Sequence, residues 1–233
     1  MLLSHSHRFV FIKPPKTAGS SVESALRLFC VANSEPEGVS AHIWPETISG
    51  AGIVTESGNT VPVTGLKPHM SIYQARTLIG APIFDDYLKI SIVREPFSRA
   101  ISLFWWHLRQ NQPDSYHALA KAPATEVREA FQGFLLGNRP FVKWARLERF
   151  TNPRALGPKR FIIRFEHLHE DFNSLIRELG GNPNDMTLPA YKTRVNPRRI
   201  ADADHYSLIS RQLIRNLWRK DFSQHGYPRV PKR

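Results

Sequence analysis

Apolar residues along this chain fall into short runs and into stretches with helical spacing. Three β-branched and aromatic runs, at 8–12, 87–93 and 160–165, are each typical of a buried strand. A stretch with helical periodicity follows each run. Strands separated by helices predict an α/β fold with a mostly parallel sheet covered on both faces. Ligands of such folds bind beyond the carboxyl ends of the strands.

The expected helices carry recognisable start and stop signals. Capping boxes are expected at Ser20-x-x-Glu23 and at Ser71-x-x-Gln74. The helix after the second box is expected to stop at 80–82, and Pro96 suits the first turn of a further helix. Other helices are expected over 125–136, 141–150, 171–179 and 205–220, and a hairpin over 53–63 with its turn at 57–59.

The composition fits an ordinary globular protein with a large positive surplus. The chain has 233 residues, 41% of them hydrophobic, and its 32 Lys and Arg against 20 Asp and Glu give a net charge of +12. These values exclude a disordered basic tail. No repeat or boundary divides the chain, so we expect a single domain over 1–233. The surplus charge requires an anionic partner.

The sequence shows no signal for a membrane span, secretion or a metal site. No apolar run is long enough to cross a bilayer, and the first residues lack the charged head and cleavage site of a signal peptide. The single cysteine, Cys30, excludes an intramolecular disulfide, and no Cys/His cluster has metal-ligand spacing. We therefore expect a cytoplasmic protein without a metal.

The segment between the first strand and the first helix has the composition of an anion-binding loop. Small residues let backbone N–H groups approach an anion, the following helix directs its positive dipole end there, and Lys16 adds a full charge. The loop is not a Walker A loop, because the lysine precedes the glycine. A Ser-capped helix after a strand also occurs without any ligand, so that alternative stays open. The candidate binding residues are Lys16, Thr17, Ala18, Gly19, Ser20 and Ser21.

A second candidate anion site follows the second strand. Arg94 lies at the expected strand end, and Ser102 follows eight residues later on the next helix. A guanidinium group together with hydroxyl groups suits a phosphate. The alternative is that Arg94 pairs with Glu95 or Glu166 and that Ser102 is a tolerated polar residue. Helical spacing places on one face Ser98, Ser102, Trp105 and Arg109.

Together the two motifs resemble those of the PAPS-dependent sulfotransferases, especially the branch acting on carbohydrates. Residues 16–21 are similar to the family's 5′-phosphosulfate loop, 93–102 to its 3′-phosphate motif, and 161–172 to its late strand and loop. The resemblance implies a three-layer, P-loop-like fold, PAPS as donor and no required metal. It implies that Lys16 stabilises the departing phosphate. It also implies that a basic C-terminal segment with Thr193 and Arg198 closes over the 3′-phosphate, although such a run is otherwise a solvated face.

The resemblance further places a histidine base between the two phosphate motifs. His69 fits that position, just before an expected helix, and an imidazole suits removal of a proton from an acceptor hydroxyl. The alternative is that His69 only packs against or caps that helix. His107 and His167 are weaker candidates for the base, and a capping box already explains Glu23.

The acceptor is expected to be a hydroxyl group on a carbohydrate. Positive charge beyond the donor site favours an anionic glycan. Trp44, Trp105 and Trp106 either stack on sugar rings or pack in the core. Just before the loop, Lys13 and Pro14 stand where the family usually has apolar or histidine residues. The sequence does not indicate an oligomeric state.

Two other function classes remain open. A P-loop kinase or nucleotidase needs a Walker A loop and Mg²⁺-binding carboxylates after a strand, and neither is evident. A basic nucleic-acid-binding domain accounts for the charge and the aromatic content, but no recognisable binding motif supports it. We therefore expect no nucleic-acid partner.

Overall fold

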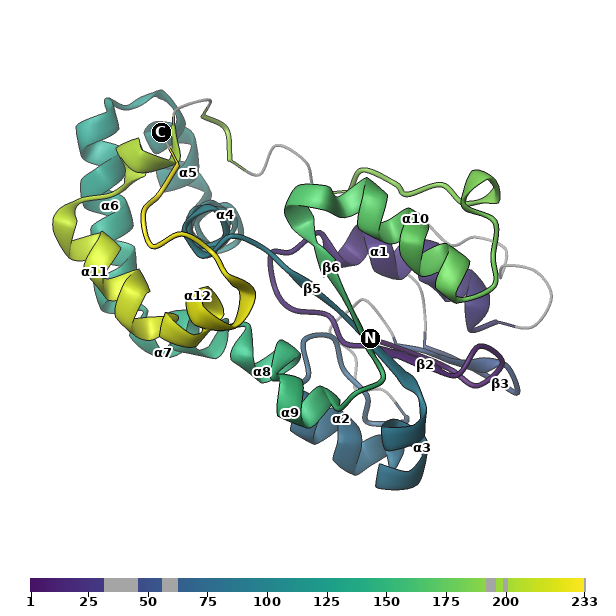
Figure 1. Cartoon of the computed structure of the whole chain (residues 1–233). Coiled ribbons are helices and arrows are strands. Elements are labelled where there is room, and N and C mark those ends of the chain that lie inside the picture. Colours follow the sequence, from purple (N-terminus) through teal and green to yellow (C-terminus); the bar gives the residue numbers. More distant parts are fainter. Residues whose placement is uncertain (32–45, 56–62, 192–195, 199–200, 233) are drawn as a thin grey trace. The chain divides into compact units, whose positions relative to one another are not determined.

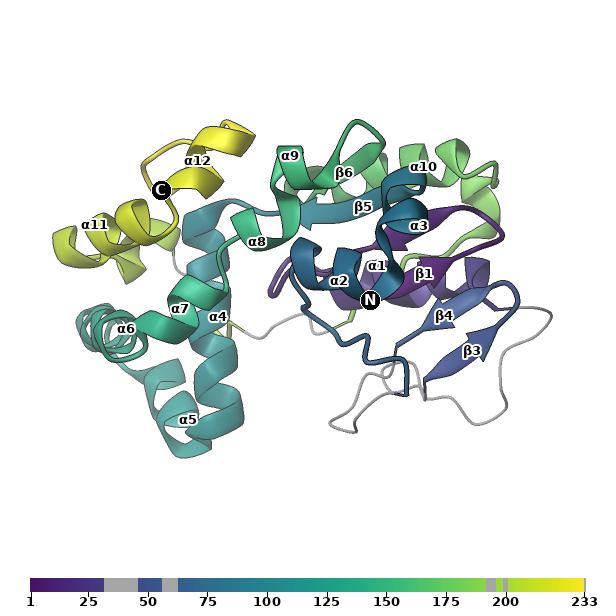
Figure 2. The ribbon, with the colours of Figure 1, turned by 90° about the horizontal axis from the view of Figure 1, so that it is seen from below.

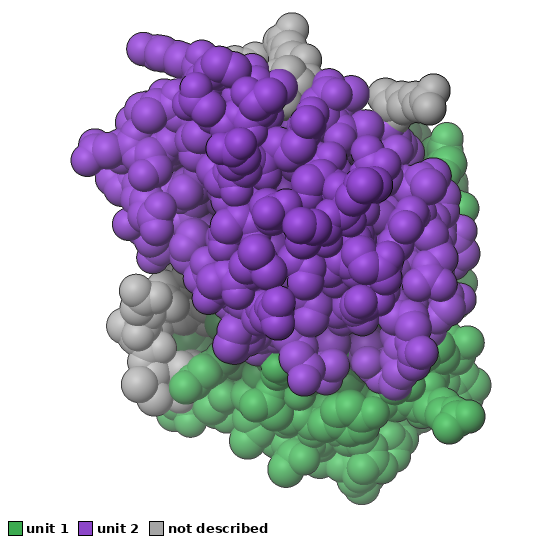
Figure 3. Space-filling model, turned by 90° about the vertical axis from the view of Figure 1, so that its left-hand side faces the viewer, with its two compact units in different colours: residues 1–93, 149–191 green, residues 94–148, 192–233 purple. Residues whose placement is uncertain are grey.

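A computed structural model describes residues 1–31, 46–55, 63–191, 196–198 and 201–232. The chain divides into two compact units, coloured separately in Figure 3. Unit 1 consists of residues 1–93 and 149–191, and unit 2 of residues 94–148 and 192–233. The predicted turn at 57–59, Trp44 and Thr193 lie outside the described residues.

Unit 1 contains a six-stranded sheet with the order β3-β4-β1-β2-β5-β6. β2 pairs in parallel with β5, and β5 in parallel with β6, with Phe11 opposite Ile90 and Val93 opposite Arg164. β1, β3 and β4 add antiparallel pairs on the other side of β2, and Figure 2 shows β3 and β4 at that edge. The strands are β1 (Leu2–Ser4), β2 (Phe9–Phe11), β3 (Thr47–Ser49), β4 (Gly52–Val54), β5 (Leu88–Val93) and β6 (Arg160–Arg164).

Helices cover both faces of this sheet (Figure 1). Because side chains alternate along a strand, Phe9 and Phe11 pack on one face with helices α1 and α10, and Val10 packs on the other with α2 and α3. The three-layer α/β fold is therefore confirmed, with the parallel pairing in the part of the sheet formed by β2, β5 and β6. The main helices of unit 1 are α1 (Gly19–Leu26), α2 (Ile72–Ile79), α3 (Ala81–Asp86), α9 (Pro153–Leu156) and α10 (Leu168–Glu178).

Unit 2 is helical and has a core of its own. Aromatic rings fill it, among them Phe104 and Phe131 with ring centroids 5.3 Å apart, and Phe97 and Tyr206 at 5.0 Å. Trp105 is fully buried in this core, whereas Ser102 on the same face of α4 is half-buried. The helices are α4 (Pro96–Asn111), α5 (Pro113–Lys121), α6 (Ala124–Gly137), α7 (Arg139–Trp144), α11 (Leu208–Leu217) and α12 (Arg219–His225), with α8 (Glu148–Thr151) at the boundary between the two units.

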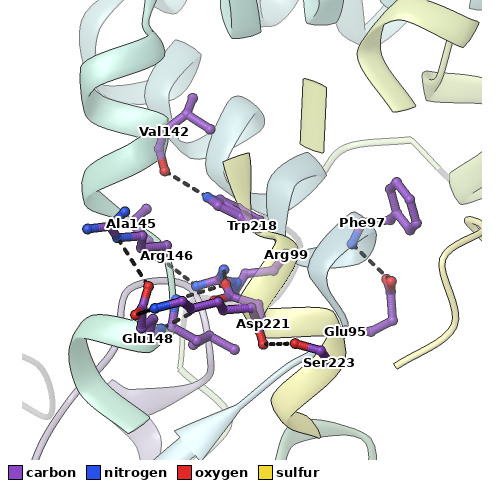
Figure 4. A network of polar contacts seen from close by, with 12 residues as sticks. Glu95, Phe97, Arg99, Val142, Ala145, Arg146, Glu148, Trp218, Asp221 and Ser223 are labelled. Atoms are coloured by element: carbon purple, nitrogen blue, oxygen red, sulfur yellow. Dashed lines mark hydrogen bonds and ion pairs between the residues drawn. The ribbon is translucent and has the colours of Figure 1, made fainter. Parts of the chain in front are cut away.

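A buried polar network ties helices of unit 2 together (Figure 4). Arg99 on α4 donates to a carboxylate oxygen of Asp221 on α12 at 2.6 Å and to the carbonyl oxygen of Ala145 at 2.6 Å. The Arg99 guanidinium lies 4.0 Å from the ring centroid of Trp218. The Asp221 carboxylate also accepts the backbone N–H groups of Leu147, at 2.8 Å, and Glu148, at 3.2 Å. One ion pair therefore also satisfies backbone groups where α7 leads into α8.

Two of the predicted helices are interrupted. The region 141–150 contains most of α7 and all of α8 except its last residue, rather than one helix. The region 205–220 starts at the last residue of a 3-10 turn (Asp202–His205) and contains α11 and the start of α12. Trp218 separates α11 from α12, with a non-helical backbone at φ −117° and ψ 30°, and its buried indole donates to the carbonyl oxygen of Val142 at 2.8 Å. The strands β1 and β3 were not predicted, because their three positions show no pattern that distinguishes a strand.

Candidate functional site

The candidate anion-binding loop follows β2, at the sheet edge where β5 also ends. Parallel pairing of β2 with β5 brings their carboxyl ends, at Phe11 and Val93, to the same edge. Lys16 and Ala18 both adopt left-handed backbone conformations, with φ of 63° and 64°. The buried Thr17 hydroxyl donates to the carbonyl oxygen of Pro14 at 3.1 Å, which fastens the turn. Lys16 is half-buried between these residues.

Helix α1 begins at this loop without a side-chain cap. Ala18 is the N-cap residue, and no described side chain bonds to the free N–H groups of the first turn. The predicted capping box at Ser20 and Glu23 is therefore wrong. The Ser21 hydroxyl accepts the backbone N–H of Tyr191 at 3.2 Å, so it holds the loop in place. The backbone at the start of α1, together with Lys16, remains as the candidate anion-binding part of the loop.

His69 lies two residues before Ser71, the N-cap of α2, and the capping box of Ser71 with Gln74 is confirmed. His69 Nδ1 lies 2.9 Å from the carbonyl oxygen of Lys13. A carbonyl oxygen only accepts, so Nδ1 carries the proton and Nε2 carries the lone pair. Burial, followed by the charge of Lys13, lowers the pKa of His69 to about 4. The ring is therefore neutral at pH 7 and in the tautomer that a base acting through Nε2 requires.

Glu23 is fully buried and has partners distant in sequence instead of a capping role. Its carboxylate contacts the Lys13 ammonium and the Met1 amino group. Burial opposes ionisation, but the charges of Met1 and Lys13 outweigh it and lower the pKa of Glu23 to about 2. Glu23 is thus a carboxylate engaged by two cations, which makes it a poor general base.

The second motif lies at the start of α4 in unit 2. Arg94 donates from Nη2 to the hydroxyl oxygen of Ser98 at 2.8 Å. The Glu95 carboxylate accepts the backbone N–H groups of Phe97, at 3.0 Å, and Ser98, at 2.6 Å, and so caps α4. Ser102 is half-buried one turn after Ser98. A guanidinium and two hydroxyls therefore line one side of this helix, while Glu95 has a capping function.

Arg198 has partners of its own in unit 2. Its guanidinium donates to the carbonyl oxygen of Leu119 at 3.3 Å and also to that of Ala122. Both carbonyls lie at the carboxyl end of α5, where a cation is favoured by the helix dipole. Phosphate binding by Arg198 and by Thr193 stays a prediction.

The other histidine candidates have different surroundings. His107 is half-buried, with Nδ1 3.4 Å from Asn111 Nδ2, and burial lowers its pKa. His167 is exposed, and its Nδ1 lies 3.3 Å from a carboxylate oxygen of Glu170. Of these histidines, only His69 has a described bond to the segment that leads into the loop.

Lys13 has three contacts in the candidate site that the sequence did not predict; in the sequence it is only a departure from the family pattern. Its carbonyl holds His69, its ammonium pairs with Glu23, and its aliphatic stem lies against Gly19. A Cβ at Gly19 would come within 2.7 Å of Lys13 Cγ, so the glycine at this position is required by the lysine stem. These three contacts depend on the tertiary fold, so no sequence pattern predicts them.

No metal cluster and no membrane-crossing helix occurs among the described residues. No three His, Cys, Asp or Glu side chains gather there as metal ligands would. None of the helices in these ranges is both long and apolar enough to cross a bilayer.

The chain was compared with protein-family models, with curated proteins and with solved structures. The family model described as "Sulfotransferase family" matches residues 1–228, which is nearly the whole chain. Neither the curated proteins nor the solved structures yielded a match. The match includes both candidate anion-binding motifs and the segment with His69, and it favours sulfuryl transfer over the kinase and nucleic-acid-binding alternatives.

Proposed function

Because the chain belongs to the sulfotransferase family, we propose that it transfers the sulfuryl group of PAPS to a hydroxyl group on a carbohydrate. The observation that carries this proposal is the uncapped start of α1 behind the left-handed turn at Lys16 and Ala18. Unpaired N–H groups and a helix dipole there favour an anion, and Lys16 adds its charge.

PAPS has anionic groups at two ends, and the chain has a motif suited to each. The loop at 16–21 fits the 5′-phosphosulfate, because its backbone amides and Lys16 present positive charge. Arg94, Ser98 and Ser102 fit the 3′-phosphate, because a guanidinium and hydroxyls donate to phosphate oxygens. Thr193 and Arg198 are proposed as further contacts of the 3′-phosphate.

The proposed reaction needs a cation for the leaving group and a base for the acceptor. The acceptor oxygen forms a bond to sulfur, and the bond between sulfur and the bridging phosphate oxygen breaks with its electron pair passing to that oxygen. Lys16 stabilises the charge that develops there, an effect worth about 10²–10³-fold in rate. His69 Nε2 accepts the hydroxyl proton, which is worth about 10²–10⁴-fold.

The nucleotide proposal is tested by thermal unfolding with adenosine 3′,5′-bisphosphate and without Mg²⁺. The nucleotide should raise Tm, because a ligand that binds only the folded state stabilises that state. Lys16→Ala and Arg94→Ala should each reduce this increase, because each removes a proposed contact with the nucleotide. The Tm increase given by adenosine 5′-monophosphate should be reduced equally by Lys16→Ala. It should not change in Arg94→Ala, because this nucleotide lacks the 3′-phosphate. Lys159→Ala, which changes an exposed lysine of unit 1, is the matched control. The absence of any shift at millimolar nucleotide would contradict PAPS as donor.

The base is tested by transfer of labelled sulfate from PAPS. His69→Ala should abolish transfer and keep nucleotide affinity, whereas His167→Ala, at an exposed histidine of the same unit, should change neither. Unchanged turnover in His69→Ala would assign the base elsewhere.

The proposed acceptor is an anionic carbohydrate. The net charge of +12 supports a glycan that carries sulfate or carboxylate groups. Labelled PAPS should therefore modify anionic glycans faster than neutral ones, with a preference that weakens as salt is added. Faster transfer to peptide or phenolic hydroxyls would overturn the carbohydrate assignment.

A further inference from the structure

We propose that Glu23 and Lys13 form a positioning pair that joins the donor loop to the base, so that His69 and the start of α1 are held in one arrangement. The inference rests on the proposed function, since it assigns a task to residues beside the proposed base and loop. It concerns residues that do not themselves contact the reacting atoms.

Lys13 contacts both parts of the proposed site. Its backbone carbonyl oxygen accepts the Nδ1 proton of His69 at 2.9 Å, and this bond selects the tautomer with the lone pair on Nε2. Its side-chain stem passes over Gly19, the first residue of α1, so closely that a Cβ there would lie 2.7 Å from Lys13 Cγ. A displacement of Lys13 would therefore change the position of His69 and that of the start of α1 at the same time.

Glu23 fixes the far end of the Lys13 side chain. The carboxylate lies one turn into α1, is 1% exposed, and contacts the ammonium of Lys13 and the amino group of Met1. A buried carboxylate that loses a cationic partner is strongly penalised. The Lys13 ammonium is thus held beneath α1, and its backbone is held with it.

The pair also sets the charge that His69 experiences. The charged groups acting on His69 are Lys13 and the Met1 amino group, which lower its pKa, and Glu23, which raises it. If Glu23 were neutral, the positive charge of Lys13 would act on the ring without an opposing carboxylate. A ring under that influence is a weaker base. In addition, a Lys13 residue that has lost its contact with Glu23 holds its carbonyl oxygen less firmly at His69 Nδ1.

The test begins with the intact protein, with any affinity tag at the carboxyl end so that the Met1 contact is preserved. Nitrogen-15 NMR of labelled histidine, assigned with His69→Ala, should show His69 neutral at pH 7 with its proton on Nδ1. A proton on Nε2 would overturn the proposal without any further variant.

Glu23→Gln keeps the side-chain shape and removes the charge. We expect kcat to fall about tenfold, which is only part of the about 10²–10⁴-fold that a general base contributes, because His69 itself is retained. The affinity for adenosine 3′,5′-bisphosphate should stay within about threefold, and the Nδ1-protonated fraction of His69 should decrease. Asp86→Asn, which removes the same charge from an exposed ion pair of unit 1, should alter neither quantity.

Lys13→Met keeps the stem over Gly19 and removes the ammonium, so it gives a second test if Glu23→Gln folds poorly. The losses of kcat in Lys13→Met and Glu23→Gln should not multiply in the double variant, because the two residues act as one unit. Wild-type kcat and an unchanged His69 tautomer in the single variants would overturn the positioning role and leave the proposed function intact. Loss of transfer as complete as in His69→Ala, with the tautomer unchanged, would also overturn it, because Glu23 would then act directly. An active His69→Ala would instead refute the proposed base.

Discussion

Each of the two compact units contains a buried ion pair, and the two pairs have different surroundings. In unit 1, Lys13 and Glu23 lie beside the loop and His69, and Lys13 contributes its carbonyl and its stem as well as its charge. In unit 2, Arg99 and Asp221 contact backbone groups near α7 and α8 and the ring of Trp218. The first pair is placed to influence chemistry, and the second to hold helices together.

This difference shows why a buried ion pair has to be interpreted from the groups around it. Two buried charges stabilise a protein little compared with an apolar pair, but removal of one partner is costly in either case. The Arg99 network also satisfies backbone donors and acceptors, so an apolar replacement would leave these groups unpaired. The Lys13 pair has its additional contacts with a candidate base and a candidate binding loop. Changes in the second pair should therefore affect stability alone, and changes in the first pair should affect turnover as well as stability.

The largest stability effect is expected from Asp221→Ala. It leaves the Arg99 guanidinium buried without its carboxylate and removes the acceptor of two backbone N–H groups. We expect the free energy of unfolding to fall by about 3–5 kcal/mol, measured by urea denaturation. A loss below about 1 kcal/mol would contradict the claim that the pair of Arg99 and Asp221 holds the helices of unit 2 together.

A somewhat smaller effect is expected from the titration of Glu23. Its pKa is lowered from an ordinary 4.5 to about 2, so its contribution is fully present above pH 4.5 and is lost as the pH falls through 2. This difference between the folded and unfolded pKa of Glu23 corresponds to about 3 kcal/mol at most in the free energy of unfolding. Urea denaturation from pH 6 to 2 should therefore show a shallower decline in Glu23→Gln than in the wild type. Glu178→Gln, at an exposed carboxylate on α10, should keep the wild-type slope.

The smallest effect is expected from Lys220→Ala. Lys220 pairs with Glu148 next to the Arg99 network, but its side chain is 55% exposed. Exposed ion pairs are worth about 0–1 kcal/mol, so Tm should hardly change. A large decrease in Tm would mean that the network of unit 2 extends to the surface.

Sequence patterns predicted what depends on neighbouring residues and failed where partners are distant. The strands β2, β5 and β6 follow from runs of β-branched and aromatic residues, and the cap at Ser71 follows from residues three apart; both predictions are confirmed. The same pattern at Ser20 and Glu23 was misleading, because Glu23 takes partners from Lys13 and Met1. Burial against another segment outweighs a local capping preference in such a case.

The candidate site shows the same division. Composition identified the loop at 16–21, and the structure adds that Thr17 and Ser21 use their hydroxyls on Pro14 and Tyr191. Tyr191 is far along the chain from Ser21, so no local spacing indicates the contact. The hydrogen bond from His69 to the Lys13 carbonyl oxygen could not be predicted either, because every residue has a backbone carbonyl and the sequence does not show which one accepts.

The contact between Gly19 and the Lys13 stem has a consequence for protein engineering. A methyl group at position 19 fits only if the side chain at position 13 yields, so the two positions share one fixed volume. A library that varies the loop while keeping Lys13 will recover glycine at 19. A library that shortens residue 13 at the same time will open position 19 to alanine and serine.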